Sequence, residues 1–216
     1  AMYSILALNK IGANCNMLNP TFTDQQLTDR INETEASVLF VVNELYGRVE
    51  KIIPKTCIKT VITCAAVNSL GPIVKFIKKA KNISNTLSWG KFITGGRYIS
   101  PPVEPPYQHN TPAIMVYSSG TTGASKGIQL TNNSINATIT QYEHAGFDFV
   151  RQDRYFAQIP IWFSTGISVT MLVPLCLGIT VILEPVYNFE IFYKHISKYK
   201  PHFLITASGL VDYLRN

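Results

Sequence analysis

Hydrophobic and polar residues form short blocks along the chain, and the blocks favour helices and strands in alternation. In the first half we expect two helices and two strands, at Tyr3–Ile11, Thr23–Glu33, Ser37–Val42 and Thr60–Cys64. The pattern Thr23-Asp-Gln-Gln26 is typical of a capping box, which starts a helix. The two strands are continuous apolar runs, as in parallel sheets that are buried on both faces. Helices between such strands predict βαβ crossovers and an α/β fold.

A run of prolines divides the chain. Residues 101–106 hold four prolines in six positions, and such a segment favours a stiff, extended linker. We therefore expect two α/β subdomains, residues 1–105 and residues 106–216. The second half continues the alternation, with elements expected at Ala113–Tyr117, Gly127–Leu130, a helix from Thr131, Gly166–Leu177, Ile179–Leu183, Phe189–Tyr199, Phe203–Thr206 and a short helix capped by Ser208. Together these elements predict parallel βαβ-type sheets with helices on both faces.

One loop of the second half carries distinctive chemistry. The sequence Tyr117-Ser-Ser-Gly-Thr-Thr-Gly-Ala-Ser-Lys-Gly127 holds three glycines, five hydroxyl side chains and one cation between two apolar strands. Glycines let the backbone turn its N–H groups toward a ligand, hydroxyls add donors, and a terminal lysine suits phosphate. A Ser/Gly-rich surface loop without a ligand is the alternative, but such a loop rarely lies between two hydrophobic strands. We predict a cradle for a polyphosphate.

This loop differs from the common nucleotide-binding motifs. A Walker A loop needs lysine directly after glycine and before serine or threonine, whereas here Ser125 precedes Lys126 and Gly127 follows it. The GxGxxG fingerprint of dinucleotide-binding folds does not occur in the sequence. The sequence therefore predicts phosphate binding of another type.

Composition and charge limit the classes of protein to which the chain can belong. Of 216 residues, 46% are hydrophobic and 15% are charged, so the chain can bury a large core and is not disordered. The net charge of +6 suits a polyanionic ligand such as ATP. A basic stretch with Lys75, Lys78, Lys79 and Lys81 could also face nucleic acid. No recognition motif accompanies it, so we interpret it as the solvated face of a helix and expect no nucleic-acid partner.

Signals for a membrane or for secretion are weak. The uncharged stretch Tyr155–Leu183 is long enough to suggest a membrane span, but Pro160, Gly166, Pro174 and Gly178 interrupt it. A buried helix followed by a buried strand explains it better. The first residues lack the charged region of a signal peptide, and the four cysteines have no CxxC spacing and are expected as reduced thiols. These features predict a cytoplasmic protein without a transmembrane span.

The glycine-rich loop resembles the signature of the adenylate-forming, or AMP-binding, enzyme superfamily. This superfamily includes acyl-CoA synthetases, luciferases and the adenylation domains of peptide synthetases. The family form is Tyr-Thr-Ser-Gly-Thr-Thr-Gly-x-Pro-Lys-Gly, followed by an apolar strand and Thr-His. The chain has Ser118, Ser125 and Asn132 in place of the first threonine, the proline and the histidine.

The resemblance extends along nearly the whole chain. Three further segments are similar to the family, at Ala7–Pro20, Pro160–Gly166 and Lys200–Leu214. The second of these is similar to the Pro-Leu-Phe-His-x-x-Gly segment at the acyl pocket, so the resemblance places Trp162, Phe163 and Gly166 there. Phe163 stands where many acyl-CoA synthetases have a gating histidine. For the two aromatic residues, ordinary core packing is the alternative.

The resemblance implies an acid–thiol ligase, most like an acyl-CoA synthetase or fatty-acid–CoA ligase, that uses ATP, Mg²⁺ and coenzyme A on a small carboxylic acid. In the family, the carboxylate attacks the α-phosphate of Mg-ATP, pyrophosphate leaves, and a thiol takes the acyl group. By resemblance, the phosphates of ATP would be bound by Ser118, Ser119, Gly120, Thr121, Thr122, Gly123 and Lys126. Lys126 would be the catalytic cation that neutralises the pyrophosphate, and Ser118 would also approach Mg²⁺.

Several family segments are not found in the sequence, among them Tyr-Gly-x-Thr-Glu and the C-terminal domain with its catalytic lysine. The resemblance therefore implies an internal fragment of the large N-terminal domain, inactive alone and open to self-association through its truncated edges. Two alternatives stay open. One is the amino-acid adenylation domain of a peptide synthetase, although Ser164 stands where such domains usually have aspartate. The other is a non-catalytic nucleotide-binding module.

Overall fold

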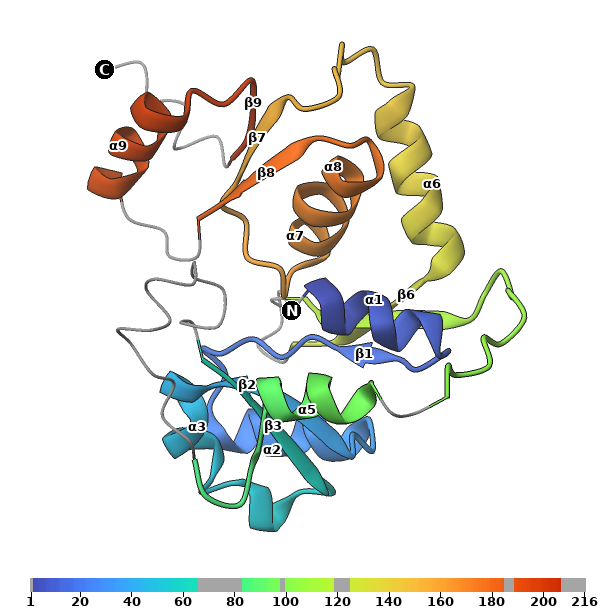
Figure 1. Ribbon diagram of the computed structural model, residues 1–216, viewed down its shortest axis with the longest axis vertical. Helices are drawn as coiled ribbons and strands as arrows, with labels where there is room; N and C mark the ends of the chain where they lie inside the picture. Colours follow the sequence, from blue (N-terminus) through green and yellow to red (C-terminus); the bar gives the residue numbers. More distant parts are fainter. Residues whose placement is uncertain (1, 66–82, 98–99, 119–124, 185–188, 207–216) are drawn as a thin grey trace. The chain divides into compact units, whose positions relative to one another are not determined.

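The computed structural model describes residues 2–65, 83–97, 100–118, 125–184 and 189–206 (Figure 1). Helices and strands alternate as the sequence predicts, and parallel strand pairs joined by helices give an α/β fold. The helix expected around Lys75 and the one expected after Ser208 lie outside the described residues. No helix in the described part of the chain is both long and apolar enough to cross a membrane.

The chain forms two compact units, one of which is discontinuous. The continuous unit is Pro20–Val103, and the discontinuous unit joins Ala1–Asn19 to Glu104–Asn216. The division after Val103 falls inside the proline run. It differs from the contiguous halves expected from the sequence, because strand β1 (Cys15–Asn16) pairs in parallel with β5 (Pro112–Tyr117) and so belongs with the later residues. Whether each unit acts as a functional subdomain stays a prediction.

The continuous unit is built on a parallel sheet with the order β2-β3-β4. Its elements are α2 (Asp24–Glu33), β2 (Val38–Val42), α3 (Asn43–Val49), the short 3-10 helix η1 (Ile53–Lys55), β3 (Thr60–Cys64), β4 (Leu87–Ser88) and α5 (Trp89–Gly96). The predicted capping box is confirmed, since the Gln26 N–H donates to Thr23 Oγ1 at 3.2 Å and the Thr23 N–H donates to Gln26 Oε1 at 2.8 Å. The predicted burial of both faces is wrong for strand β2. Val38 and Val42, which share one face of β2, are 45% and 43% exposed, so this face is not fully covered within the described part of the chain.

The first sheet of the discontinuous unit has the order β1-β5-β6. Its central strand β5 is buried over most of its length. Strand β6 (Gly127–Thr131) is antiparallel to β5, unlike the predicted parallel pattern, because the residues between them are too few for a crossover. Helices α1 (Met2–Lys10) and α6 (Asn132–Glu143) contribute Ile5 and Ile135 to a core shared with this sheet.

The second sheet of this unit has the order β8-β7-β9, and both strand pairs are parallel. Its strands are β7 (Arg154–Ala157), β8 (Thr180–Leu183) and β9 (Phe203–Ile205). On one face, the ring of Phe156 packs against that of Phe192 in α9 (Phe189–Tyr199), with centroids 5.6 Å apart. On the other face, Tyr155 and Ala157 pack with Leu177. Helical segments therefore cover both faces, as predicted.

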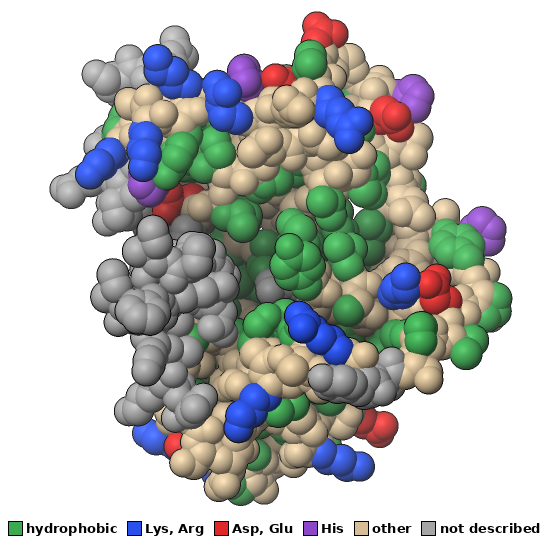
Figure 2. Space-filling model, viewed as in Figure 1, with side chains coloured by type: hydrophobic (Ala, Val, Ile, Leu, Met, Phe, Trp, Pro, Cys, Tyr) green, Lys and Arg blue, Asp and Glu red, His purple; other side chains and the backbone are tan. Residues whose placement is uncertain are grey.

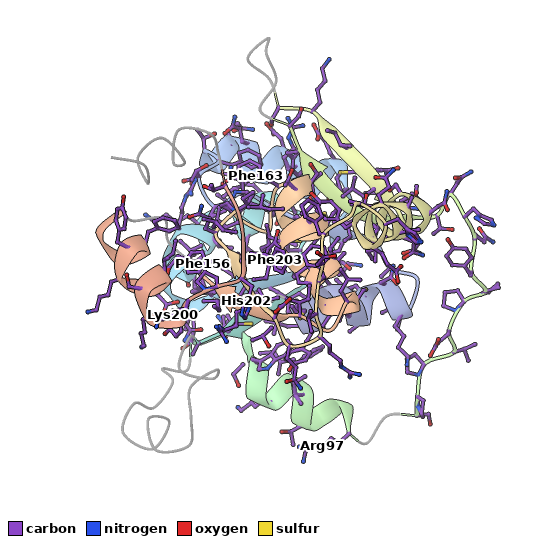
Figure 3. The ribbon with its side chains drawn as sticks, turned by 90° about the horizontal axis from the view of Figure 1, so that it is seen from above. Arg97, Phe156, Phe163, Lys200, His202 and Phe203 are labelled. Carbon is purple, nitrogen blue, oxygen red and sulfur yellow. The ribbon has the colours of Figure 1, made fainter. Side chains whose placement is uncertain are left out.

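The two edges of the sheet β8-β7-β9 carry different residues. Lys200 and His202 precede β9 at the amino edge, whereas Phe163 lies beyond the carboxyl end of β7 and is well separated from them (Figure 3). In parallel sheets, ligands bind outside the carboxyl ends of the strands. The edge that leads to Phe163 is therefore the one on which a site is expected.

The helix predicted at residues 166–177 consists of three segments. They are α7 (Ser164–Ile167), the π-helical turn η3 (Ser168–Leu172) and α8 (Val173–Cys176). A Cβ atom on Gly166 would lie 1.9 Å from the backbone oxygen of Pro160, so only glycine fits there. The Thr170 hydroxyl donates to the Gly166 oxygen at 2.6 Å. π-Helical turns often occur at functional sites, which draws attention to Pro160–Gly166.

Candidate phosphate-binding hairpin and acyl segment

The predicted phosphate loop connects β5 to β6. Tyr117 and Gly127 are partners in the antiparallel register, and the Ser118 N–H donates to the backbone oxygen of Lys126 at 3.0 Å. Ser118 and Lys126 therefore face each other across the base of a hairpin. The other predicted phosphate-binding residues lie outside the described residues, and their role stays a prediction: Ser119, Gly120, Thr121, Thr122 and Gly123.

The base of this hairpin is anchored to β1. The hydroxyl of Tyr117, a buried residue, donates to Asn16 Oδ1 at 2.9 Å. The Met17 N–H donates to the Met115 oxygen at 2.9 Å. Lys126, in contrast, is exposed. An anchored hairpin base with an exposed cation and a hydroxyl side chain suits an anion that approaches from solvent.

Helix α6 begins directly after β6 and fixes the far end of the hairpin. The expected N-cap is confirmed, since the Ser134 N–H donates to Thr131 Oγ1 at 3.1 Å and the Thr131 N–H donates to Ser134 Oγ at 3.0 Å. Asn132, which replaces the family's histidine, accepts a hydrogen bond from the Asn9 amide at 2.6 Å. This bond joins α1 to α6, so Asn132 has a structural role in this chain.

Of the predicted acyl residues, Trp162 and Phe163 directly precede α7, and Gly166 lies within it. Gly166 is buried against the Pro160 backbone, while Trp162 is half-buried and Phe163 is 38% exposed. The two aromatic rings lie 6.2 Å apart. Figure 2 shows exposed hydrophobic side chains over α7, α8 and the end of β8, where Leu175 and Leu183 are 41% and 61% exposed. The acyl-pocket role of these three residues stays a prediction.

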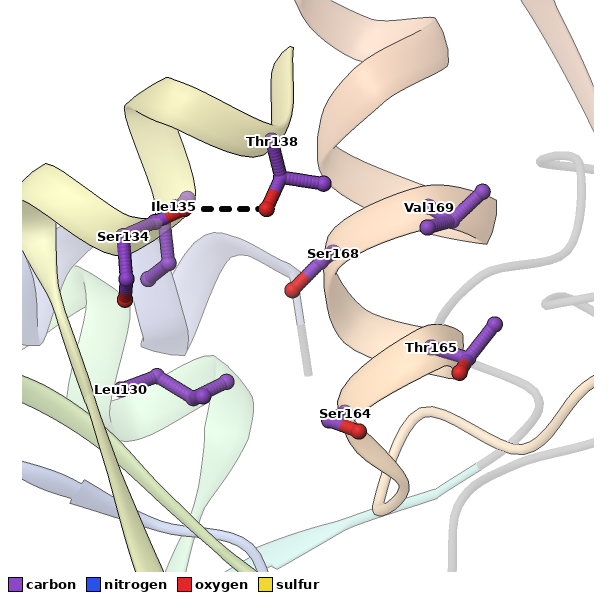
Figure 4. A pocket seen from close by; sticks show the side chains of 8 residues that line it. All are labelled: Leu130, Ser134, Ile135, Thr138, Ser164, Thr165, Ser168 and Val169. Carbon is purple, nitrogen blue, oxygen red and sulfur yellow. Dashed lines mark hydrogen bonds between the residues drawn. The ribbon is translucent and has the colours of Figure 1, made fainter. Parts of the chain in front are cut away.

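A small pocket lies between α6 and the α7–η3 segment (Figure 4). It has a volume of about 230 Å³, below the usual range for drug-sized ligands. Five hydroxyl side chains and three apolar ones line it, from Leu130, Ser134, Ile135, Thr138, Ser164, Thr165, Ser168 and Val169. None of these side chains is charged, so the pocket suits a neutral group and does not compete with the hairpin for phosphate.

The fold gives partners to two histidines for which sequence spacing showed none. His195 Nδ1 of α9 contacts a carboxylate oxygen of Glu184, which follows β8. His202 Nδ1 accepts the Arg154 N–H at 2.9 Å and lies 3.2 Å from Asp153 Oδ1. Each pair joins separate elements of the sheet β8-β7-β9. Periodicity within one element could not reveal them.

Three of the four cysteines have thiols of low reactivity. Burial raises the pKa of Cys15 to about 11 and also raises the pKa of Cys64 and Cys176. These thiols stay protonated at neutral pH and are poor nucleophiles. Among the described residues, no group of three or more His, Cys, Asp or Glu side chains could hold a metal ion.

Comparisons with known proteins show the family to which the chain belongs. The whole chain, residues 1–216, matches the family of AMP-binding enzymes, and the chain belongs to this family. A long-chain-fatty-acid–CoA ligase of Haemophilus influenzae is 25% identical over 233 residues, covering all of this chain and 41% of that protein. An acetyl-coenzyme A synthetase of Pseudoalteromonas atlantica is 27% identical over 217 residues, covering 96% of this chain and 33% of that protein.

Solved structures show the same fold. A long-chain-fatty-acid–CoA ligase of Archaeoglobus fulgidus superposes with a TM-score of 0.74 at 23% identity, covering 94% of this chain and 36% of that one. The resemblance to adenylate-forming enzymes and the α/β fold class are thereby confirmed. The chain spans less than half the length of these relatives, so their activities bear on it only as proposals.

Proposed function

We propose that this chain carries the ATP-phosphate site and part of the acyl site of an AMP-forming acid–thiol ligase. The reaction would join a carboxylic acid to ATP and then to coenzyme A. A carboxylate oxygen bonds to the α-phosphorus, the bond to the pyrophosphate oxygen breaks, and pyrophosphate leaves. The thiolate sulfur then bonds to the acyl carbon, and AMP leaves with the electron pair.

The base of the β5–β6 hairpin carries this proposal. It places Ser118 and Lys126 opposite each other at the end of a buried strand, and the strand is fixed to β1 by the Tyr117–Asn16 hydrogen bond. Pyrophosphate gains charge as it leaves, so a pre-positioned ammonium group stabilises the transition state more than the ground state. Lys126 would serve as that group.

Magnesium would enter with the nucleotide. Mg²⁺ is usually bound by one or two protein oxygens, substrate phosphates and water, and the Ser118 hydroxyl is an oxygen ligand of this kind. Ser118 would hold the ion beside the phosphates, where Mg²⁺ supplies charge neutralisation. No cluster of acidic side chains in the described part of the chain suggests a separate, resident metal.

The test is ATP–pyrophosphate exchange on the full-length protein with a panel of carboxylic acids. Replacing Lys126 with Ala should lower kcat/KM for ATP by about 100- to 1,000-fold, as expected for loss of one oxyanion-stabilising group. Lys51→Ala, which removes an exposed lysine from the other unit, should change it less than twofold. Equal rates for Lys126→Ala and the unchanged protein would contradict the proposal.

The same assay separates the alternatives. A peptide-synthetase adenylation domain would exchange pyrophosphate with α-amino acids. Ser164, an exposed hydroxyl residue, offers no carboxylate to an ammonium group at this position, which favours unsubstituted or hydroxylated acids. A non-catalytic module would bind ATP without exchange for any acid.

We also propose that the 216 residues alone do not turn over and that they self-associate. The relatives are more than twice as long, and large hydrophobic side chains such as Val38, Val150 and Leu183 are 45% to 63% exposed. Apolar surface of this kind promotes association. Adenylate formation by this chain alone, or a monomer in sedimentation at high concentration, would overturn the respective statement.

A further inference from the structure

Three polar side chains stand in one row across the carboxyl edge of the sheet β8-β7-β9. Gln158, Glu184 and Thr206 are the residues that directly follow β7, β8 and β9. The parallel register aligns the ends of these strands, so the three residues continue in line. Because side chains alternate along strands, all three share the face of Phe156, which α9 covers. The row borders the apolar core beneath α9.

Two members of this row have partners. Glu184 pairs with His195 of α9, and its own N–H donates to the Ala157 oxygen at 2.9 Å. The Thr206 hydroxyl accepts a hydrogen bond from Gln158 Nε2 at 2.5 Å. These bonds hold the row together across three strands and one helix.

The amide oxygen of Gln158, unlike the other two members of the row, has no hydrogen-bond donor within the described residues. Gln158 is only 7% exposed, and within the described residues no group donates a hydrogen bond to its Oε1. A buried carbonyl oxygen without a donor destabilises a folded protein, so native structures contain few of them. The amide is also held in place by Thr206, so it cannot turn toward water without losing that bond.

The position of this oxygen points to a ligand. Carboxyl ends of parallel strands are where open α/β sheets bind their ligands. Gln158 lies two residues before Pro160, whose backbone oxygen is in contact with Gly166 in the candidate acyl segment. Ile159 connects Gln158 to Pro160, and its backbone oxygen lies 3.4 Å from the Thr170 hydroxyl of η3. Gln158 is therefore joined to the acyl segment by a short stretch of backbone that is itself fixed by contacts.

We propose that Gln158 is a specificity-determining residue whose amide oxygen accepts a hydrogen bond from an O–H or N–H group of the carboxylic acid substrate. This inference rests on the proposed ligase function. An alkyl acid leaves the oxygen unpaired, whereas an acid with a donor at the right carbon pairs it. Sites that hydrogen-bond a substrate discriminate strongly against analogues that lack the group. For this one neutral bond we expect a preference of about 10- to 100-fold in kcat/KM.

The test compares octanoate with its monohydroxylated and monomethoxylated isomers in ATP–pyrophosphate exchange by the full-length protein. One hydroxy isomer should exceed octanoate by about 10- to 100-fold in kcat/KM, and its methoxy counterpart, which cannot donate, should not. Gln158→Met keeps the size of the side chain but removes the acceptor and should bring the two acids within threefold of each other. Thr206→Val removes the hydrogen bond that holds the amide in place and should therefore weaken the preference without reversing it.

The possible results distinguish a failure of this inference from a failure of the proposed ligase function. If no acid supports exchange, the proposed function fails. If octanoate is used but no hydroxy isomer is preferred, or if Gln158→Met retains the preference, this inference fails and the ligase function stands. A preference for a methoxy isomer would also overturn it, because the buried group would then act as a donor. Circular dichroism of both variants checks that they fold, and equilibrium binding of the same acids gives a second readout.

Discussion

The two parallel sheets of the molecule resemble each other in architecture and differ in how they use polar groups. In β2-β3-β4, the buried hydroxyl of Thr63 lies 3.2 Å from that of Thr86, which donates to the Ile83 oxygen at 2.9 Å. In β8-β7-β9, the buried amide of Gln158 has one end paired and one end unpaired within the described residues.

The difference indicates different roles for the two sheets. Polar groups that satisfy each other stabilise a fold, whereas an unpaired one lowers stability unless a ligand completes it. The connections after the strands agree with this. Strand β4 passes directly into α5, and the Ser88 hydroxyl accepts the Lys91 N–H at 3.5 Å. Strand β7 instead leads into the turn around Pro160, beyond which the chain becomes a π-helical turn. We infer that β2-β3-β4 supports the structure, whereas β8-β7-β9 contributes to the acyl part of the proposed site.

The strongest test of this difference uses two glycines. Gly166→Ala places a methyl group where the Pro160 oxygen lies, so we expect it to lower the free energy of unfolding by about 3 kcal/mol. Gly47→Ala, in α3 of the other unit, has no atom within 4 Å of the new methyl and should raise stability by about 0.5–1 kcal/mol. Urea unfolding of both variants measures this. A neutral Gly166→Ala would show that the turn before α7 is not constrained.

A second test compares the two buried polar groups. Thr63→Val removes a paired hydroxyl and should cost about 1 kcal/mol without changing substrate preference. Gln158→Met removes an unpaired oxygen but leaves the Thr206 hydroxyl without its donor, so the two effects offset to within about 0.5 kcal/mol. The double variant Gln158→Met/Thr206→Val should be more stable than the single one. Thermal unfolding without ligand measures these differences. If Gln158→Met lowered the free energy of unfolding by more than about 2 kcal/mol, the Gln158 amide would have a structural role and not a ligand-binding one.

A smaller effect is expected at Tyr155 on the opposite face of β7. Its hydroxyl is buried and has no hydrogen-bond partner in the described part of the chain, and burial raises the pKa of Tyr155 well above its usual 10. The unfolded chain therefore loses this proton above pH 10 while the folded chain keeps it, so stability falls as the pH rises. Tyr155→Phe should add up to about 1 kcal/mol at neutral pH and reduce the alkaline loss. Urea unfolding at pH 7 and above pH 10 tests both expectations. If the free energy of unfolding of Tyr155→Phe fell with rising pH as steeply as that of the unchanged protein, Tyr155 would not be the cause of the alkaline loss.

Local patterns in the sequence predicted much of this structure. Short-range rules predicted the capping box at Thr23, the helix start at Thr131 and the bounds of α9, and all three are confirmed. The two strands that flank the loop with Ser118 and Lys126 were also predicted from local signals, but their antiparallel pairing was not.

Features that depend on distant residues could not be predicted in this way. Hydropathy does not show whether a helix contains a π-helical turn such as the one at Ser168–Leu172. The row formed by Gln158, Glu184 and Thr206 depends on the register of strands that lie up to 48 residues apart. Each residue looks unremarkable in its own segment, and only the sheet brings them into line.

The pairing of β1 with β5 has a consequence for synthesis on the ribosome. Strand β1 cannot pair until Ile114, the partner of Cys15, has been synthesised 99 residues later (114 − 15). At about 5–20 residues per second this takes roughly 5–20 s. All of Pro20–Val103 has emerged by then and has had time to fold first. During synthesis the segment Ala1–Asn19 therefore stays without its partner strand β5, and a chaperone could shield it.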